Sequence, residues 1–325
     1  MTLSIISNLS RLATIRLAGV DIKFYLYSTQ RAGSVLSCFI RSFRYDYIVL
    51  NGSLHNALML AFLKWIFPFN RTKIVIVDFL LATPVGRKDS IKARLIALLL
   101  RKVSVMILYY KNTQGLQKYY RIPPEKFRYV PFKINQYELI QQVQPKDEGY
   151  IFCGGKTRRD FPTLFEAIKD LGYPVKVVTT HNDDIAQHGS YLNDQLAPAN
   201  VEIVRLDGGP EAFISYMASA RIVVLPIKPD ICGAGIGVYI MAMALKKCVI
   251  ISSGPGAEDI LSPDQAIIVP PGDSLSLRKA IVKAFSDSVY RSIFERNGYK
   301  YAMGLQGEER LLQSIVSELQ ADFMS

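Results

Sequence analysis

Two segments in the second half of the chain have the composition of anion-binding loops. The first joins two glycines to three cations, at Gly154, Gly155, Lys156, Arg158 and Arg159. Glycine lets the backbone approach a ligand closely, and ammonium and guanidinium groups neutralise phosphate oxygens. A helix predicted to begin near Pro162 adds partial positive charge at its N-terminus. This segment therefore predicts phosphate binding, with a tight turn carrying solvated charges as the alternative.

The second segment places a glycine at every other position before a run rich in Ala and Met. Its glycines are Gly233, Gly235 and Gly237, and Val238 follows them. Valine at position 238 departs from the dinucleotide-binding fingerprint, and no strand runs directly into the first glycine. Free amides at a helix start suit one diphosphate group. Close packing of a helix on a sheet is the alternative explanation of the glycines.

Two carboxylates follow predicted strands and could act on hydroxyl groups. Glu258 lies in the turn-rich segment 252–259 and could bind a ribose or sugar hydroxyl, or simply lie on a surface turn. Asp78 ends the β-branched run 74–77 and could deprotonate an acceptor hydroxyl. Asp78 could equally cap the next turn.

The elements that must position these residues alternate between strand and helix in both halves. Strands are expected at 20–27, 46–50, 74–77 and 105–109, and then at 150–153, 175–179, 201–205, 222–226, 248–252 and 266–269. Helical segments separate them, for example 32–42 and 161–171, which is the order of a parallel sheet covered on both faces. We expect two Rossmann-like, doubly wound α/β domains facing a cleft, at 1–140 and 149–325, joined through the polar segment 134–149.

Length and composition agree with two globular domains and exclude several classes of protein. The chain has 325 residues, of which 50% are hydrophobic and 21% charged, so disordered, collagenous and coiled-coil proteins are excluded. Its four cysteines and three histidines show no ligand-like spacing, so we expect no bound metal, no disulfide framework and a cytoplasmic location. The apolar stretch 54–69 is interrupted by polar residues and is too short to span a membrane. The N-terminus lacks the pattern of a secretory signal.

Charge is divided unevenly between the halves. Up to Glu148 there are 22 Lys and Arg against 8 Asp and Glu, whereas the remainder has 17 against 20. The basic half could face an anionic membrane surface, and the segment 87–102 could form a basic amphipathic helix, although its leucines could also belong to the core. Dispersed cations without a zinc-finger spacing or an RNP-like aromatic block argue against nucleic acid. A solvated surface with a bias for solubility is the remaining alternative.

Residues 150–285 resemble the donor domain of GT-B glycosyltransferases, most nearly the glycosyltransferase family 4 or group 1 enzymes. The resemblance rests on ordered blocks: the strand with Gly154–Lys156 and the Arg159-Asp-Phe that follows, the run 220–226, the segment from Gly235 to Ser253, and Val269-Pro-Pro-Gly-Asp. It implies transfer of a hexose or similar sugar from a UDP- or GDP-sugar to an acceptor hydroxyl, without a bound metal or cofactor. A lipid-linked or polysaccharide acceptor at the inner membrane face, in polysaccharide biosynthesis, would suit the basic half.

The resemblance also implies roles for individual residues. Lys156 and Arg159 would hold the diphosphate, the glycine loop 233–238 would supply amides, and Arg205 with its neighbours would lie near the base. The retaining branch carries two glutamates eight positions apart, where this chain has Gly233 and Met241. The usual histidine of the first domain is replaced by the neighbourhood of Asp78, which favours an inverting reaction. A catalytically silent homologue acting as a binding partner and a nucleotide-sugar epimerase remain as alternatives.

Overall fold

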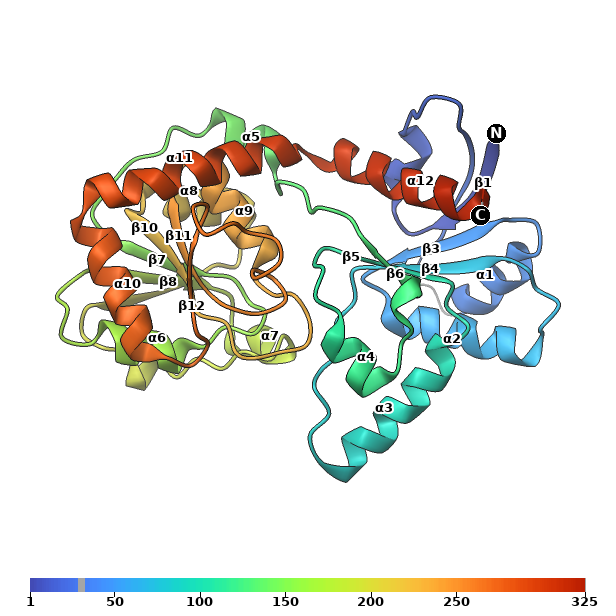
Figure 1. Ribbon diagram of the computed structural model, residues 1–325, viewed down its shortest axis with the longest axis horizontal. Coiled ribbons are helices and arrows are strands. Elements are labelled where there is room, and N and C mark those ends of the chain that lie inside the picture. Colours follow the sequence, from blue (N-terminus) through green and yellow to red (C-terminus); the bar gives the residue numbers. More distant parts are fainter. Residues whose placement is uncertain (29–32, 325) are drawn as a thin grey trace. The chain divides into compact units, whose positions relative to one another are not determined.

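A computed structural model describes residues 1–28 and 33–324. The chain forms two compact units (Figure 1). Unit 1 comprises Met1–Pro131 together with the residues from Glu309 onward, and unit 2 is Phe132–Glu308. Each unit is built on its own six-stranded sheet.

The sheet of unit 1 is parallel, with the strand order β2-β1-β3-β4-β5-β6. Its strands are β1 (Thr2–Ser7), β2 (Asp21–Leu26), β3 (Tyr47–Asn51), β4 (Lys73–Val77), β5 (Val105–Leu108) and β6 (Phe127–Tyr129). The inner strands are continuous runs of buried β-branched and aliphatic residues, as expected for a parallel sheet covered on both faces.

Helices of unit 1 cover both faces of this sheet. They are α1 (Ser34–Ser42), α2 (Leu54–Ile66), α3 (Gly86–Leu100), α4 (Gln114–Tyr120) and α12 (Glu308–Met324), with short 3-10 turns at Ser10–Thr14 and Pro124–Lys126. In Figure 1, α12 lies on the opposite side of β3 and β4 from α2 and α3. The hydroxyl of Tyr47 on β3 donates to Leu319 O and to Asp322 Oδ2 of α12, and Lys73 Nζ lies 2.9 Å from the same carboxylate oxygen.

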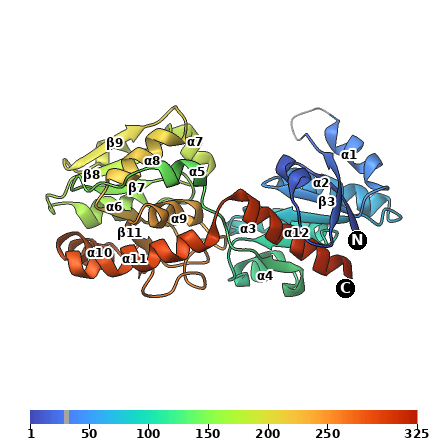
Figure 2. The same cartoon turned by 90° about the horizontal axis from the view of Figure 1, so that it is seen from above.

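Unit 2 has the strand order β12-β11-β10-β7-β8-β9, again all parallel. Its strands are β7 (Ile151–Gly154), β8 (Val175–Thr179), β9 (Val201–Arg205), β10 (Ile222–Leu225), β11 (Cys248–Ser252) and β12 (Ile267–Val269). Its helices are α5 (Tyr137–Gln142), α6 (Phe161–Ile168), α7 (Asn182–Gln187), α8 (Pro210–Ser219), α9 (Ile236–Ala244), α10 (Ser274–Ser286) and α11 (Ser288–Leu305), with a 3-10 turn at Asp194–Leu196. Figure 2 shows α11 running beside α9, against which it packs.

The two parallel sheets confirm the predicted fold class of two Rossmann-like α/β domains. Sequence reasoning missed β1, because no strand was recognised in residues 1–19, although Leu3, Ile5 and Ile6 are fully buried there. The unit boundary lies at Pro131 rather than near 140–149, and the expected linker 134–149 contains α5. The last helix, α12, belongs to unit 1, whereas the expected second domain ran to residue 325. The expected start of the first helix at Ala32 lies outside the described residues.

Candidate functional site

The glycine and cation loop follows the central strand of unit 2. From β7 the chain continues outward through β8 and β9, and it then returns to the other side of β7 as β10, β11 and β12. The change of direction between β7 and β10 is a topological switch point, and open α/β sheets bind ligands outside the carboxyl ends of the strands there. Loop 155–160 after β7 and loop 226–235 after β10 flank this point.

Arg159 is the buried cation of the site. It is 1% exposed, and its guanidinium donates from Nε to Gly154 O at 2.7 Å and from Nη1 to Thr157 O at 2.8 Å. Burial lowers its pKa to about 10, so the group stays protonated at neutral pH. No described carboxylate forms an ion pair with it at 4 Å or closer. Arg159 therefore shapes its own loop through carbonyl oxygens and leaves a buried positive charge without a matching anion.

The two glycine loops meet around this guanidinium. A Cβ at Gly155 would lie 2.5 Å from Nη2 of Arg159 and 3.2 Å from Cγ2 of Val238. A Cβ at Gly235 would lie 3.9 Å from Nη1 of Arg159, and the φ of Gly235 is +84°, which favours glycine at the N-cap of α9. The structure thus brings segments 154–159 and 233–238 to one place. Gly233, the first glycine of the second segment, is half-buried and lies two residues before the N-cap of α9.

The two half-buried cations of the first loop, Lys156 and Arg158, form ion pairs with other segments of unit 2. Lys156 Nζ lies 2.6 Å from Asp184 Oδ2 of α7, and Arg158 Nε lies 2.5 Å from Asp230 Oδ2 in the loop after β10. The backbone at Arg158 has a φ of +55°, and its carbonyl accepts a hydrogen bond from the Lys228 amide. These pairs tie the loop after β7 to its neighbours on both sides. The two cations are therefore already partly neutralised.

Arg205 ends the edge strand β9 and is placed by neighbouring loops. Its Nη1 donates to Thr180 O at 2.9 Å, and its Nη2 lies 2.6 Å from Asp194 Oδ1. The Thr180 hydroxyl in turn donates to Asp184, the partner of Lys156. A chain of polar contacts therefore links Arg205 to the first loop across β8.

A cavity of about 170 Å³ opens between the loops after β10, β11 and β12. Lys228, Asp230 and Glu258 are the charged residues that line it. Glu258 is exposed, and Lys228 Nζ donates to Gly189 O at 3.2 Å. Sequence reasoning did not assign roles to Lys228 and Asp230, although both follow the apolar run of β10 at the same sheet edge.

Three glycines at this edge have close neighbours that a Cβ would meet. A Cβ on Gly256 would lie 2.5 Å from Ala234 O and 2.8 Å from Ala234 N, so the turn after β11 packs directly against the backbone of the glycine loop. Gly154 faces the rings of Phe152 and Phe213. At Gly237 a Cβ would lie 2.8 Å from Nδ2 of Asn135, so this residue faces the segment that enters unit 2.

Asp78 follows β4 at the carboxyl edge of the sheet in unit 1. Its φ of +47° is unusual for a residue with a side chain, and its amide donates to Ile107 O at 3.0 Å. Surrounding protein atoms raise the pKa of its carboxyl to about 6, although the residue is exposed and solvent screens part of this effect. The segment after Asp78 lines a cavity of about 340 Å³ with His55 of α2 and with Asp89 and Lys92 of α3.

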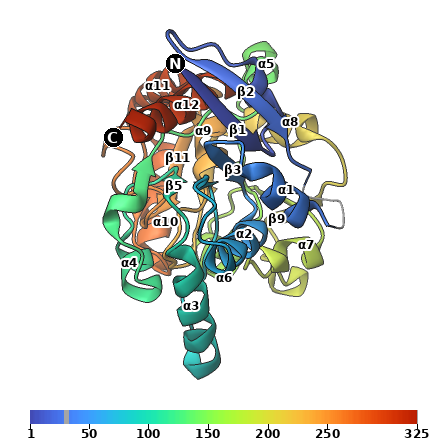
Figure 3. The same cartoon turned by 90° about the vertical axis from the view of Figure 1, so that its right-hand side faces the viewer.

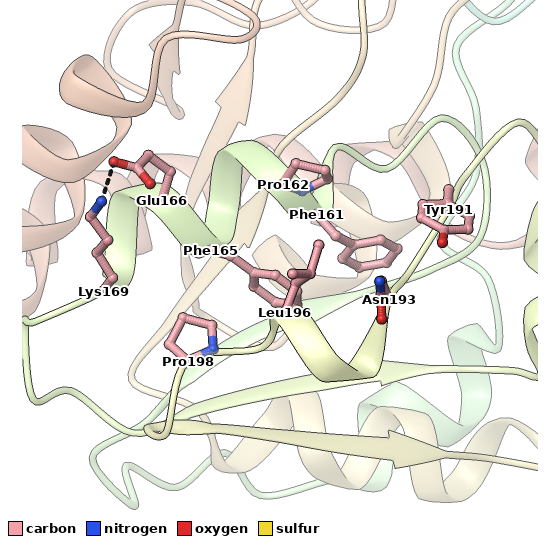
Figure 4. A pocket seen from close by; sticks show the side chains of 9 residues that line it. All are labelled: Phe161, Pro162, Phe165, Glu166, Lys169, Tyr191, Asn193, Leu196 and Pro198. Carbon is pink, nitrogen blue, oxygen red and sulfur yellow. Dashed lines mark ion pairs between the residues drawn. The ribbon is translucent and has the colours of Figure 1, made fainter.

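Another cavity, of about 250 Å³, lies on the outer side of α6 and is unrelated to these loops (Figure 4). Phe161, Phe165 and Leu196 line it, and the Glu166–Lys169 ion pair lies at one end. None of the predicted site residues is among its lining residues. Its walls are mainly apolar, and Lys169, the one cation among its lining residues, is paired with Glu166.

Among the described residues no cluster of three or more potential metal ligands occurs, and the four cysteines are buried and form no disulfide bond. No described helix is both long enough and apolar enough to cross a bilayer. Unit 2 gathers cations, carboxylates and backbone amides at the carboxyl edge of its sheet.

Residues 152–287 match the family model described as Glycosyl transferases group 1. This part of unit 2 is similar to a group 1 glycosyltransferase domain. The matched residues contain both glycine loops and every strand of the second sheet except the first residue of β7. The match supports the family and the enzyme class predicted from the sequence.

Solved structures resemble this chain over its full length. Sucrose-phosphate synthase from Thermosynechococcus elongatus superimposes with a TM-score of 0.70 at 13% identity, covering 100% of this chain and 99% of that one. Anabaena Alr3699/HepE in complex with UDP and glucose gives 0.66 at 14% identity, with 98% and 100% covered. A UDP-forming α,α-trehalose-phosphate synthase from Burkholderia vietnamiensis gives 0.64 at 10% identity, with 99% of each covered. These likenesses confirm the GT-B fold, and no curated protein matches the sequence.

Proposed function

We propose that this glycosyltransferase moves a sugar from a nucleotide-diphosphate sugar to an acceptor hydroxyl. The observation that carries the proposal is the meeting of the two glycine loops around the buried guanidinium of Arg159. A dianionic diphosphate would supply the negative charge that this buried cation lacks. Anabaena Alr3699/HepE, which has the same fold, binds UDP and glucose, which supports a UDP-sugar, with a GDP-sugar as the alternative.

In the proposed donor site, backbone amides at the start of α9 and the cations of the first loop face the diphosphate. Lys156 and Arg158 would exchange part of their contact with Asp184 and Asp230 for phosphate oxygens. Arg205 would lie toward the base, and Glu258 would accept hydrogen bonds from sugar or ribose hydroxyls. Negative charge on the departing diphosphate grows in the transition state, so these groups stabilise it more strongly than the bound donor.

The acceptor hydroxyl would be activated by Asp78. The Asp78 carboxylate takes the hydroxyl proton, a bond forms between the acceptor oxygen and the anomeric carbon, and the bond from that carbon to the diphosphate breaks. A pKa of about 6 suits a base that must be ionised at neutral pH. A single displacement of this kind inverts the anomeric configuration.

The acceptor side of the proposal is a membrane surface. The helix expected from 87–102 is α3, and the idea that its leucines belong to the core is wrong for Leu95 and Leu98, which are 61% and 46% exposed. On α2, Trp65 is 61% exposed, and Phe69 just beyond the helix is 85% exposed. Basic residues flank these apolar ones, at Arg41, Arg44, Arg71, Arg87, Lys88, Lys92, Arg94, Arg101 and Lys102. Exposed apolar and basic side chains in the same helical segments suit peripheral attachment to an anionic inner leaflet and a lipid-linked acceptor.

Calorimetric titration with UDP-glucose, GDP-mannose and their parent diphosphates, followed by a donor-hydrolysis screen, tests the proposal. We expect one nucleotide sugar to bind and to be slowly hydrolysed, and loss of binding in Lys156→Ala. Binding without hydrolysis or transfer would instead support a silent homologue. The presence of Gly233 and the buried Met241 where retaining enzymes have glutamates favours this alternative. Conversion of the donor to an epimeric sugar would support the epimerase. Failure of every nucleotide sugar to bind would refute the donor site.

A further inference from the structure

Unit 1 contains an apolar groove of about 830 Å³ between α1 and α2. Its walls include Leu36 of α1 and Met59, Phe62 and Leu63 of α2, and Leu99 of α3 lies at one end. The three helices follow one another with α2 in the middle, and α2 packs against both neighbours (Figure 3). The volume is at the upper end of the range of about 300–1,000 Å³ that is usual for ligand pockets.

The groove changes character along α2. At the start of α1 and α2 it is lined by Ser34, His55 and Asn56, which lie at the carboxyl edge of the sheet. Farther along α2 it is lined by Phe62 and Leu63. Because α2 runs antiparallel to the strands, the polar end lies on the same edge as Asp78, and the apolar end lies toward the opposite edge.

The surface around the groove is apolar and basic. Each helix has an exposed apolar stripe with the spacing i, i+4, i+7 or i, i+3, i+7. The stripes are Leu36 and Ile40 on α1 with Phe43 directly after it, Met59, Phe62 and Ile66 on α2, and Ile91, Leu95 and Leu98 on α3. Of the large hydrophobic side chains that are exposed among the described residues, all but five belong to unit 1. The groove is therefore continuous with the surface that we propose to rest on anionic lipid.

We infer that this groove binds the hydrocarbon chain of the lipid-linked acceptor, because it is apolar, has a polar end and lies beside basic residues. The inference rests on the proposed function and names the acceptor class, an amphiphile with a hydroxyl-bearing polar head and a long alkyl or isoprenoid chain. The head would lie near Ser34 and His55 at the sheet edge that carries Asp78. The chain would follow α2 between Leu36 and Leu63 and reach the lipid surface beyond Leu99.

Binding of n-alkyl β-glucosides from butyl to decyl, measured by calorimetry below their critical micelle concentrations, tests the inference directly. Each buried methylene strengthens binding about fourfold, so wild-type affinity should rise steeply with chain length until the groove is full. Leu63→Trp fills the groove and should weaken decyl glucoside binding at least tenfold while flattening the dependence on chain length. Met59→Glu should also weaken decyl glucoside binding and flatten the dependence on chain length. Because Met59 is 43% exposed, this substitution should not disturb the core.

Met324→Ala is the control, because Met324 lies on α12 of unit 1, is 74% exposed and does not line the groove. It should keep the wild-type dependence on chain length. Equal affinity for butyl and decyl glucoside in the wild type would overturn the inference, and so would an unchanged slope in a folded Met59→Glu variant. A different result would assign the groove to a second copy of the chain. In that case the wild type would sediment as a dimer, Met59→Glu would dissociate the dimer, and neither protein would bind decyl glucoside.

Titration of the same samples with UDP-glucose and GDP-mannose separates this inference from the proposed function. The groove variants lie outside segments 154–159 and 233–238, which form the proposed donor site and are called the donor loops. These variants should bind the donor as the wild type does. Chain-dependent binding without any donor binding would refute sugar transfer and leave the groove as a lipid site. Donor binding without chain dependence would refute the groove alone.

Discussion

At the scale of single residues, the cations of the donor loop have different tasks. Arg159 is buried and holds the carbonyls of Gly154 and Thr157, whereas Lys156 and Arg158 pair with carboxylates of neighbouring loops. A buried guanidinium that lacks a carboxylate partner lowers stability unless an anion arrives. The donor should therefore stabilise the protein against unfolding more strongly than its few contacts suggest.

Arg159→Ala should abolish donor binding and lower the free energy of unfolding by about 3 kcal/mol, because one buried and one half-buried carbonyl lose their donor and the buried side chain leaves a cavity. Urea unfolding and UDP-glucose titration measure the two effects. Lys169→Ala, in an exposed ion pair on α6, serves as the control and should change neither. Wild-type donor affinity in Arg159→Ala would contradict the role of this residue.

Asp78→Asn should remove transfer while leaving donor affinity unchanged. In the wild type the transfer rate should rise with pH through about 6, since the carboxylate form is the active base. The amide variant has no group that ionises there, so any residual activity should lose this limb of the profile. A variant that retains transfer with the wild-type pH profile would exclude Asp78 as the base.

At the scale of elements, backbone packing fixes the donor loops relative to one another. The turn after β11 approaches the backbone of Ala234, and Arg159 lies against the glycines of both donor loops. A small displacement of one loop must therefore move the other.

Gly256→Ala should lower the free energy of unfolding by about 1–3 kcal/mol and weaken donor binding, because the new methyl group meets the carbonyl and amide of Ala234. Thermal unfolding and donor titration give both quantities. Gly208→Ala is the control, since no atom lies within 4 Å of a Cβ there and its φ is not positive. Equal donor affinity in the two variants would show that the contact with Ala234 is unimportant for the site.

The apolar face of the first three helices should govern vesicle binding. Trp65→Ser together with Phe69→Ser should reduce binding to vesicles rich in phosphatidylglycerol at least tenfold, because both rings lose a buried position in the lipid interface. Lys92→Glu should reduce vesicle binding about fivefold or more at low salt, and by a smaller factor at high salt. Tyr191→Ser in unit 2, 64% exposed, is the control in the same flotation assay. Vesicle binding that survives all these changes would argue against this surface.

At the scale of the whole molecule, the chain returns to unit 1 after completing unit 2. α12 buries Leu319 completely and receives hydrogen bonds from Tyr47 and Lys73 near the edge where β3 and β4 begin. Unit 1 is therefore incomplete without the last seventeen residues of the chain.

Leu319→Ala should lower the stability of unit 1 by about 3 kcal/mol through the cavity that it leaves. Donor titration should stay at the wild-type value, because the donor loops belong to unit 2. Met324→Ala, at a residue 74% exposed, should have no effect on either measurement. Loss of donor binding in a folded Leu319→Ala variant would show that the units are coupled energetically.

The sequence by itself predicts much of the fold, because buried strands of a parallel sheet read as apolar β-branched runs separated by helices. Runs such as Ile74–Val77 and Cys248–Ser252 are identifiable without any tertiary information. The short strand β1 was missed because six residues with two serines and a threonine give a weak local signal. The glycines and cations of the donor loops were recognised from composition, since phosphate chemistry needs those residue types together.

Only the tertiary structure decided which of these groups lie side by side and which are already paired. Burial of Arg159, the ion pairs of Lys156 and Arg158, and the collision that a side chain at Gly256 would cause depend on loops far apart in the sequence. The same holds for α12, whose attachment to unit 1 depends on contacts with β3 and β4 more than 240 positions away. Local patterns record what a segment prefers by itself, whereas such contacts depend on how the whole chain packs.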